Sequence, residues 1–70
     1  MSITVEQAKS LAVCYHAFMA ADMTEQPRET AIWGSMLLDS QKETGVEILE
    51  NWWLERVINK ARAELDALAA

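Results

Sequence analysis

Cys14 and His16 are the residues of this chain whose types most readily suggest chemistry. They are its only cysteine and its only histidine, and a thiolate beside an imidazole base is a common nucleophilic pair. Two positions apart on a helix, however, the side chains point about 200° apart and cannot meet. We therefore expect Cys14 to be a small buried apolar residue and His16 to be half exposed. Only a dimer would bring two copies of the pair together at a metal ion.

The other polar residues do not form a catalytic set. A catalytic triad would have to use His16 as its base, because the chain has no second histidine. The hydroxyl residues without a nearby histidine are Ser10, Thr30, Ser35 and Ser40. The carboxylates are scattered along faces expected to be exposed, and helix-spaced ion pairs are expected for Lys60–Glu64 and Arg62–Asp66. With two glycines, the chain has no glycine-rich phosphate loop. One cysteine and one histidine cannot complete a four-ligand zinc site within one chain. We expect no enzyme activity, no cofactor and no metal.

The charge balance excludes other classes of partner. The net charge is −5, from 11 acidic and 6 basic residues, and it is negative in each of the segments 1–23, 24–44 and 45–70. Nucleic-acid-binding proteins normally carry a basic patch, because contacts with phosphates supply most of their affinity, and anionic membrane surfaces also attract basic segments. We therefore expect neither a nucleic-acid nor a membrane partner.

The elements that would position any site are helices. Apolar residues recur with helical spacing and predict an all-α, compact three-helix domain over residues 1–70, with helices at about 5–22, 27–43 and 45–68. Capping boxes fit Thr4–Gln7 before the first helix and Thr44–Glu47 before the third. Pro27 fits a first helical turn. The longest apolar run, 11–21, is too short to span a bilayer, which takes about 20 helical residues. A free thiol suits a reducing compartment, so we expect a cytoplasmic protein.

The first predicted helix is apolar nearly all round, which is typical of a buried helix, so we expect it to be the central one. The main apolar stripe of the second predicted helix consists of Ile32, Trp33, Met36 and Leu37. Gly34, in its interior, costs about 1 kcal/mol relative to alanine. Gly34 is either a tolerated defect or a point of close approach by another helix.

The two halves of the third predicted helix carry apolar residues on different sides. The first side consists of Ile48, Leu49, Trp52 and Trp53, and the second of Leu54, Val57, Ile58, Ala61, Leu65 and Leu68. Because one neighbour cannot easily cover both, we expect the chain to bind beyond itself. We assign the first set to a partner protein, since tryptophan is enriched at binding hot spots. We assign the second, with near-heptad spacing, to a two-fold homodimer. The two roles could be exchanged, because the sequence does not decide which set binds the partner and which forms the dimer.

Together these patterns predict a small acidic module that binds a larger protein and modulates it, by inhibition. Small acidic helical proteins occur among phage- and plasmid-encoded antagonists of host proteins, and this chain is similar to them in size and composition alone. One alternative is a helix-turn-helix transcription regulator, whose recognition helix would begin with Glu47, Glu50 and Asn51. Another is a DNA mimic, which requires one surface to gather Glu25, Glu29, Asp39, Glu43, Glu47 and Glu50.

Overall fold

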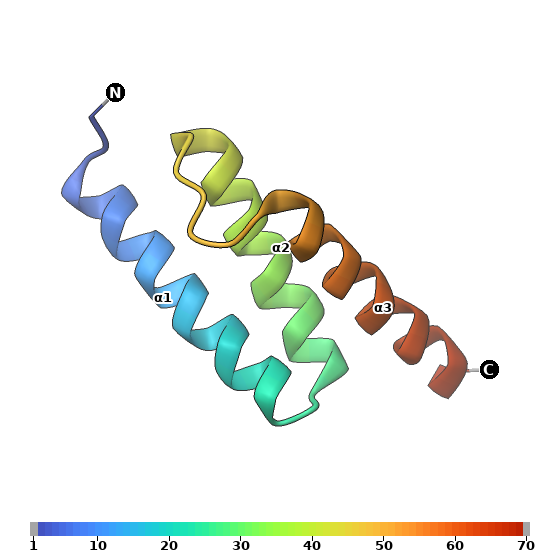
Figure 1. Cartoon of the computed structure of the whole chain (residues 1–70). Coiled ribbons are helices and arrows are strands. Elements are labelled where there is room, and N and C mark those ends of the chain that lie inside the picture. The colour runs from blue at the N-terminus through green and yellow to red at the C-terminus, as the bar shows by residue number, and fades with distance from the viewer. Residues whose placement is uncertain (1, 70) are drawn as a thin grey trace.

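Helix α2 (Pro27–Thr44) lies in the middle of the molecule, with α1 (Val5–Met23) along one side of it and α3 (Asn51–Ala69) along the other (Figure 1). The computed structural model describes residues 2–69, and this part of the chain is helical with no strand. Met1 and Ala70, which the single-domain prediction includes, lie outside the described residues. The domain measures 44 × 19 × 15 Å. The three-helix, all-α prediction is confirmed.

The prediction that the first helix is central is wrong. Helix α1 buries a single stripe at helical spacing, formed by Leu11, Cys14, Phe18 and Ala21. Its other side is exposed and carries alanines with Val5 and Val13. Scattered exposed apolar residues are normal on a protein surface, so an alanine-rich helix can look apolar all round and still need only one neighbour.

Local signals mark the start of α1 and the short turn between α1 and α2. Thr4 and Gln7 form the predicted capping box, with bonds of 2.9 and 3.0 Å between each backbone N–H and the other side chain. Helix α1 ends at Met23, and the turn formed by residues 24–26 follows. Its middle residue, Glu25, has φ of 54°. Pro27 begins α2, where its missing N–H is not needed.

The buried face of α2 matches the predicted main stripe only in part, since Leu37 is fully buried and Trp33 is half-buried against the core. Ile32 and Met36 are 44% and 46% exposed, whereas the buried residues are Thr30, Ala31, Gly34, Leu37, Gln41 and Thr44. A helix between two neighbours needs small residues at the point of closest approach. A Cβ on Gly34 would lie 2.8 Å from Ile58 Cγ1 and 3.1 Å from the Phe18 ring. Gly34 therefore marks close approach by side chains of α1 and α3 rather than by a helix backbone.

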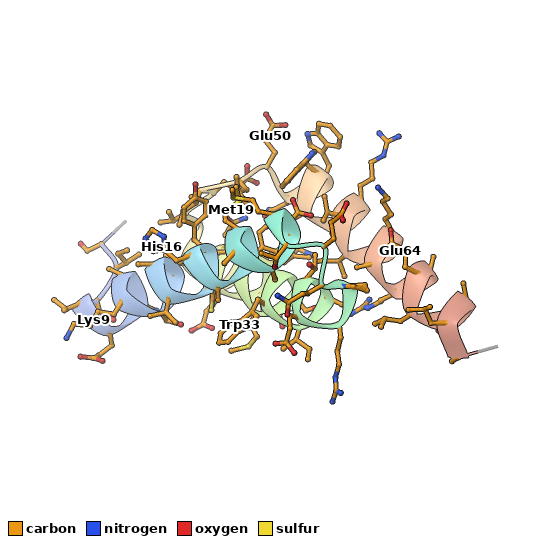
Figure 2. All side chains as sticks on the ribbon, turned by 90° about the horizontal axis from the view of Figure 1, so that it is seen from below. Lys9, His16, Met19, Trp33, Glu50 and Glu64 are labelled. Atoms are coloured by element: carbon orange, nitrogen blue, oxygen red, sulfur yellow. The ribbon has the colours of Figure 1, made fainter. Side chains whose placement is uncertain are left out.

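The core lies where side chains of all three helices meet over α2. Its buried cluster consists of Leu11, Cys14, Phe18, Leu37 and Leu54. The rings of Phe18 and Trp53 meet edge to face, with centroids 6.2 Å apart. The last turns of α3 project beyond this core (Figure 2), and Leu68 there is 77% exposed. No helix in the described part of the chain is long and apolar enough to cross a membrane.

The third helix starts later than predicted. Helix α3 begins at Asn51, and residues 45–50 form an extended connection that we call the strap. The strap returns from the end of α2 across that helix before α3 begins (Figure 1). The prediction of one long helix with two apolar sides is therefore wrong, because Ile48 and Leu49 belong to the strap and only the tryptophans belong to α3.

Candidate functional site

Most of the hydrogen bonds that hold the strap are made by one side chain, that of Gln41 on α2. Gln41 is fully buried, and its amide makes four hydrogen bonds. Its Oε1 accepts from the backbone N–H groups of Ile48 and Leu49 at 2.9 and 3.0 Å. Its Nε2 donates to the Leu49 carbonyl and to Asn51 Oδ1, both at 2.8 Å. A primary amide has two donors and two acceptor lone pairs, so Gln41 is fully satisfied.

The end of α2 shows why the strap is not helical. Gly45 adopts the left-handed conformation with φ of 77°, and its N–H donates to the Gln41 carbonyl at 2.8 Å, which closes the helix in the way common for a glycine at a helix C-terminus. The predicted capping box at Thr44–Glu47 does not form. Thr44 Oγ1 instead donates to the Ser40 carbonyl at 2.7 Å and accepts from Val46 N–H at 3.3 Å. The hydroxyl thus serves the end of α2 rather than the start of α3.

The adjacent tryptophans at the start of α3 have different environments. Trp53 is half-buried and packs on Phe18, whereas Trp52 is 59% exposed. Neighbouring residues of a helix point about 100° apart, so only one indole can turn toward the core. The indole N–H of Trp52 donates to the carboxylate of Glu50, which lies on the strap. This bond leaves the indole ring at the surface with its one polar group already satisfied.

The strap and the start of α3 form one surface, which we call the strap surface: Ile48, Leu49, Glu50, Trp52 and Trp53. These five residues line an open hollow of about 360 Å³. Leu49 packs on the core and Ile48 is 41% exposed. All four residues of the predicted partner-binding set, Ile48, Leu49, Trp52 and Trp53, are thus brought together. They line one hollow because the strap crosses α2 and leads directly into α3 (Figure 1), and not because they share a helix face.

The strap surface lies on one side of the layer formed by α1 and α2. Glu50 projects from that side, and Trp33 of α2 lies on the opposite side (Figure 2).

The structure divides the predicted self-association set. Leu54, Ile58 and Ala61 are buried within the single chain, where α3 packs on α2, so a second copy cannot cover them in this fold. Val57 and Leu65 are half-buried and Leu68 is exposed. The assignment of these residues to one continuous dimer stripe therefore has to be revised, because the stripe on the true α3 is mostly occupied by α2.

Cys14 and His16 lie apart, as their spacing predicts. Cys14 is buried in the core cluster. His16 is exposed, and its ring lies 5.4 Å from that of Tyr15, centroid to centroid. Within residues 2–69, no group of three or more His, Cys, Asp or Glu side chains is arranged to hold a metal ion. The imidazole and the thiol therefore cannot act on one substrate in a single copy of this fold.

Sequence reasoning missed Gln41, the residue that builds the site. One signal was available: buried positions of α2 follow the spacing Gly34, Leu37, Gln41, Thr44, so Gln41 continues an apolar series with a polar residue. A glutamine buried in this way needs partners, because an unsatisfied buried amide is costly. The two donors and two acceptor lone pairs of a buried glutamine amide match the unpaired N–H and C=O groups of a backbone segment that is neither helix nor strand.

Comparisons of the chain with protein-family models, with curated proteins and with solved structures found no match.

Proposed function

We propose that this protein is a binding module that recognises a larger protein through the strap surface and modulates it by occupying part of its surface. The exposed indole of Trp52 carries this proposal. It stands at the edge of an open hollow beside exposed Ile48, which lies on the strap fixed by Gln41. Tryptophan in such a position is the residue type most enriched among binding hot spots.

The strap surface indicates the chemistry of its partner. Leu49 and Trp53 offer an apolar floor, and Ile48 and Trp52 flank it. Glu50 supplies a carboxylate at the rim, next to the indole N–H that it accepts. We expect the partner to insert an apolar side chain into the hollow and to place a lysine or arginine near Glu50. The net charge of −5 favours encounter with a basic surface.

Preorganisation supports this role. A loop that orders only on binding subtracts its ordering cost from the affinity. The strap is already ordered by the four bonds of Gln41 and by the packing of Val46 and Leu49 on the core. Binding would therefore cost little backbone entropy at this segment. Inhibition follows where the occupied surface of the larger protein is one that it needs for its own activity.

Affinity capture with matched variants tests the proposal. The immobilised wild-type chain is compared with Trp52→Ser, Ile48→Ser and the control Val13→Ser, which removes an exposed apolar side chain from the outer side of α1. We expect one captured protein to be retained by wild type and control. Trp52→Ser should lower its affinity about thirtyfold, the equivalent of a hot spot of about 2 kcal/mol.

Equal retention by Trp52→Ser and wild type would contradict the assignment of the strap surface. Loss of the captured protein with Val13→Ser alone would move the site to α1. Circular dichroism of each variant shows that the helices are intact, and little loss is expected because all three positions are exposed.

The residues required for a helix-turn-helix regulator or a DNA mimic are not arranged as either function needs. Glu47 and Glu50 belong to the strap and do not lead α3, and Asn51 Oδ1 accepts from Gln41, so a recognition helix would begin without its proposed contacts. Asp39 and Glu43 each lie two positions from Gln41, about 200° around α2, and so face away from the strap acids. The acids of the proposed DNA mimic therefore do not share one surface.

Self-association as a homodimer is a separate proposal. It needs a surface other than the buried part of α3, and the outer face of α2 offers one.

A further inference from the structure

The outer face of α2 carries the second exposed apolar surface of the molecule. Ile32 and Met36, one helical turn apart, are 44% and 46% exposed, and Trp33 beside them is half-buried. Arg28 and Asp39 continue this face at its two ends and are both exposed. The one ion pair among the described residues joins Lys42 to Glu55, so Arg28 and Asp39 each have no ion-pair partner within that range.

We propose that this face binds a second copy of the chain, with the two α2 helices antiparallel across a two-fold axis. The motivating observation is that the face is self-complementary. A two-fold contact requires that if one residue meets a second, the second also meets the first. When the two-fold axis lies at the level of Gly34, on the outer side of α2, Ile32 of each copy is level with Met36 of the other. Apolar side chains therefore face each other at the centre of the contact.

Opposite charges also meet at the two ends of this face, where Arg28 faces Asp39 of the second copy, whereas Glu29 and Glu43 lie on the same face and add repulsion. Arg28 lies six residues before Gly34, about 9 Å along the helix, and Asp39 lies five residues after it, about 7.5 Å. In the antiparallel pair, Arg28 of one copy therefore lies within about 1.5 Å of the level of Asp39 of the second copy. Two identical ion pairs then flank the apolar centre.

Arg28 and Asp39 must also lie on the same side of the line that runs along the middle of this face. The two-fold axis is perpendicular to both helices, so it places the α3 side of one copy's face against the α3 side of the other's. Arg28 and Asp39 are eleven residues apart, which is about three turns and leaves them about 20° apart around the helix. The structure agrees with this spacing. Arg28 lines a groove with Arg62 and Leu65 of α3, and Asp39 lines another with Glu55 and Asn59 of α3. Both therefore lie on the side of the face toward α3.

The size of the contact sets the strength of the dimer. Stable interfaces bury about 800 Å² on each partner, and a crossing of two helices with two large apolar residues each covers less than this. The net charge of −5 on each copy also opposes association. The dimer is therefore concentration-dependent rather than permanent. Because the strap surface lies on the opposite side of the α1–α2 layer, both copies keep it accessible (Figure 2).

Sedimentation velocity over a hundredfold range of concentration tests this dimer. The wild-type sedimentation coefficient should rise with concentration toward that of a dimer. Arg28→Asp and Asp39→Arg should each weaken association about tenfold, because each converts two attractions into two repulsions. The double variant should return to within about threefold of wild type. Asp39→Arg is the sharper single variant, since it lowers the net negative charge and would strengthen association if only overall repulsion mattered.

Ile32→Ser and the control Val13→Ser complete the set, with both positions exposed so that the fold is retained. Ile32→Ser should weaken association about tenfold, and Val13→Ser should leave it unchanged. A wild-type chain that stays monomeric throughout would overturn the proposal. A double charge reversal that associates no more tightly than the single variants, or a loss of association with Val13→Ser or Trp52→Ser, would also overturn it.

Discussion

The two connections of this fold, the turn at residues 24–26 and the strap at residues 45–50, are stabilised differently. Each has one left-handed residue, Glu25 with φ of 54° and Gly45 with φ of 77°. The turn is closed by backbone bonds, including Gln26 N–H to the Ala21 carbonyl at 3.0 Å. The strap is held by the buried Gln41. A short turn closes on its own backbone, whereas a longer connection that crosses a helix needs a side chain to supply the missing partners.

The largest effect is expected from removing that side-chain amide. Gln41→Leu keeps the approximate size of the residue but leaves the N–H groups of Ile48 and Leu49 and the Leu49 carbonyl without partners. We expect the free energy of unfolding to fall by about 3 kcal/mol, because each unsatisfied buried group costs about 1–3 kcal/mol. Urea unfolding followed by circular dichroism measures the change.

Gln26→Leu is the matched control in the turn. The Gln26 side chain is exposed and donates only to Thr24 Oγ1 among the described side-chain bonds, so a change below about 0.5 kcal/mol is expected. Similar losses for the two leucine variants would break the distinction between the connections.

The next largest loss of stability is expected at Gly34, in the middle of α2. A substitution there should not act on either connection specifically. Gly34→Ala gains about 1 kcal/mol of helix propensity. Its Cβ, however, would lie 2.8 Å from Ile58 Cγ1 and 3.1 Å from the Phe18 ring. Overpacking costs about 1–3 kcal/mol, and we expect a net loss of about 1.5 kcal/mol in thermal or chemical unfolding. An alanine variant more stable than wild type would show that the three helices are not closely packed at Gly34.

Gly45→Ala should cost about 1 kcal/mol, because a residue with a Cβ is strained at φ of 77°. A Cβ there has no atom within 4 Å, so the backbone conformation alone accounts for the loss. The same unfolding assay measures it. No loss would mean that α2 does not end in the left-handed conformation and that the strap begins differently.

The smallest effect is of opposite sign and lies in the turn. Glu25→Gly should stabilise the protein by roughly 0.5 kcal/mol, since relief of the strain at φ of 54° exceeds the added entropy of glycine in the unfolded chain. A rise in melting temperature is the readout. Destabilisation by Glu25→Gly would mean that the Glu25 side chain contributes more to the turn than its backbone conformation costs.

Much of this fold is readable from local signals in the sequence. The capping box at Thr4 and Gln7 and the proline at position 27 mark helix starts, because the bonds they make or leave unmade involve only near neighbours. Thr44 and Glu47 carry the same signal, yet the Thr44 hydroxyl bonds to Ser40 and Val46. The deciding partner of the strap, Gln41, lies on another element, and a local motif cannot report it.

The candidate site was predicted in its members but not in its architecture. Ile48 and Trp52 fit a helical i,i+4 spacing, but in the structure Ile48 lies on the strap and Trp52 on the first turn of α3, which the strap leads into directly. The fates of Trp52 and Trp53 follow from adjacency, since two neighbouring indoles on a helix cannot both face one core. Which indole turns inward depends on Phe18, a residue of α1, and so on tertiary packing.

Amide hydrogen exchange at Ile48 and Leu49 tests most directly whether the strap is a fixed platform for the strap surface. Both N–H groups donate to Gln41 Oε1, at 2.9 and 3.0 Å, and that atom belongs to a fully buried side chain. We predict that both amides exchange as slowly as those in the middle of α2, and that Gln41→Leu abolishes this protection. Exchange of both amides in the wild-type chain at the rate of an unstructured peptide would contradict the account.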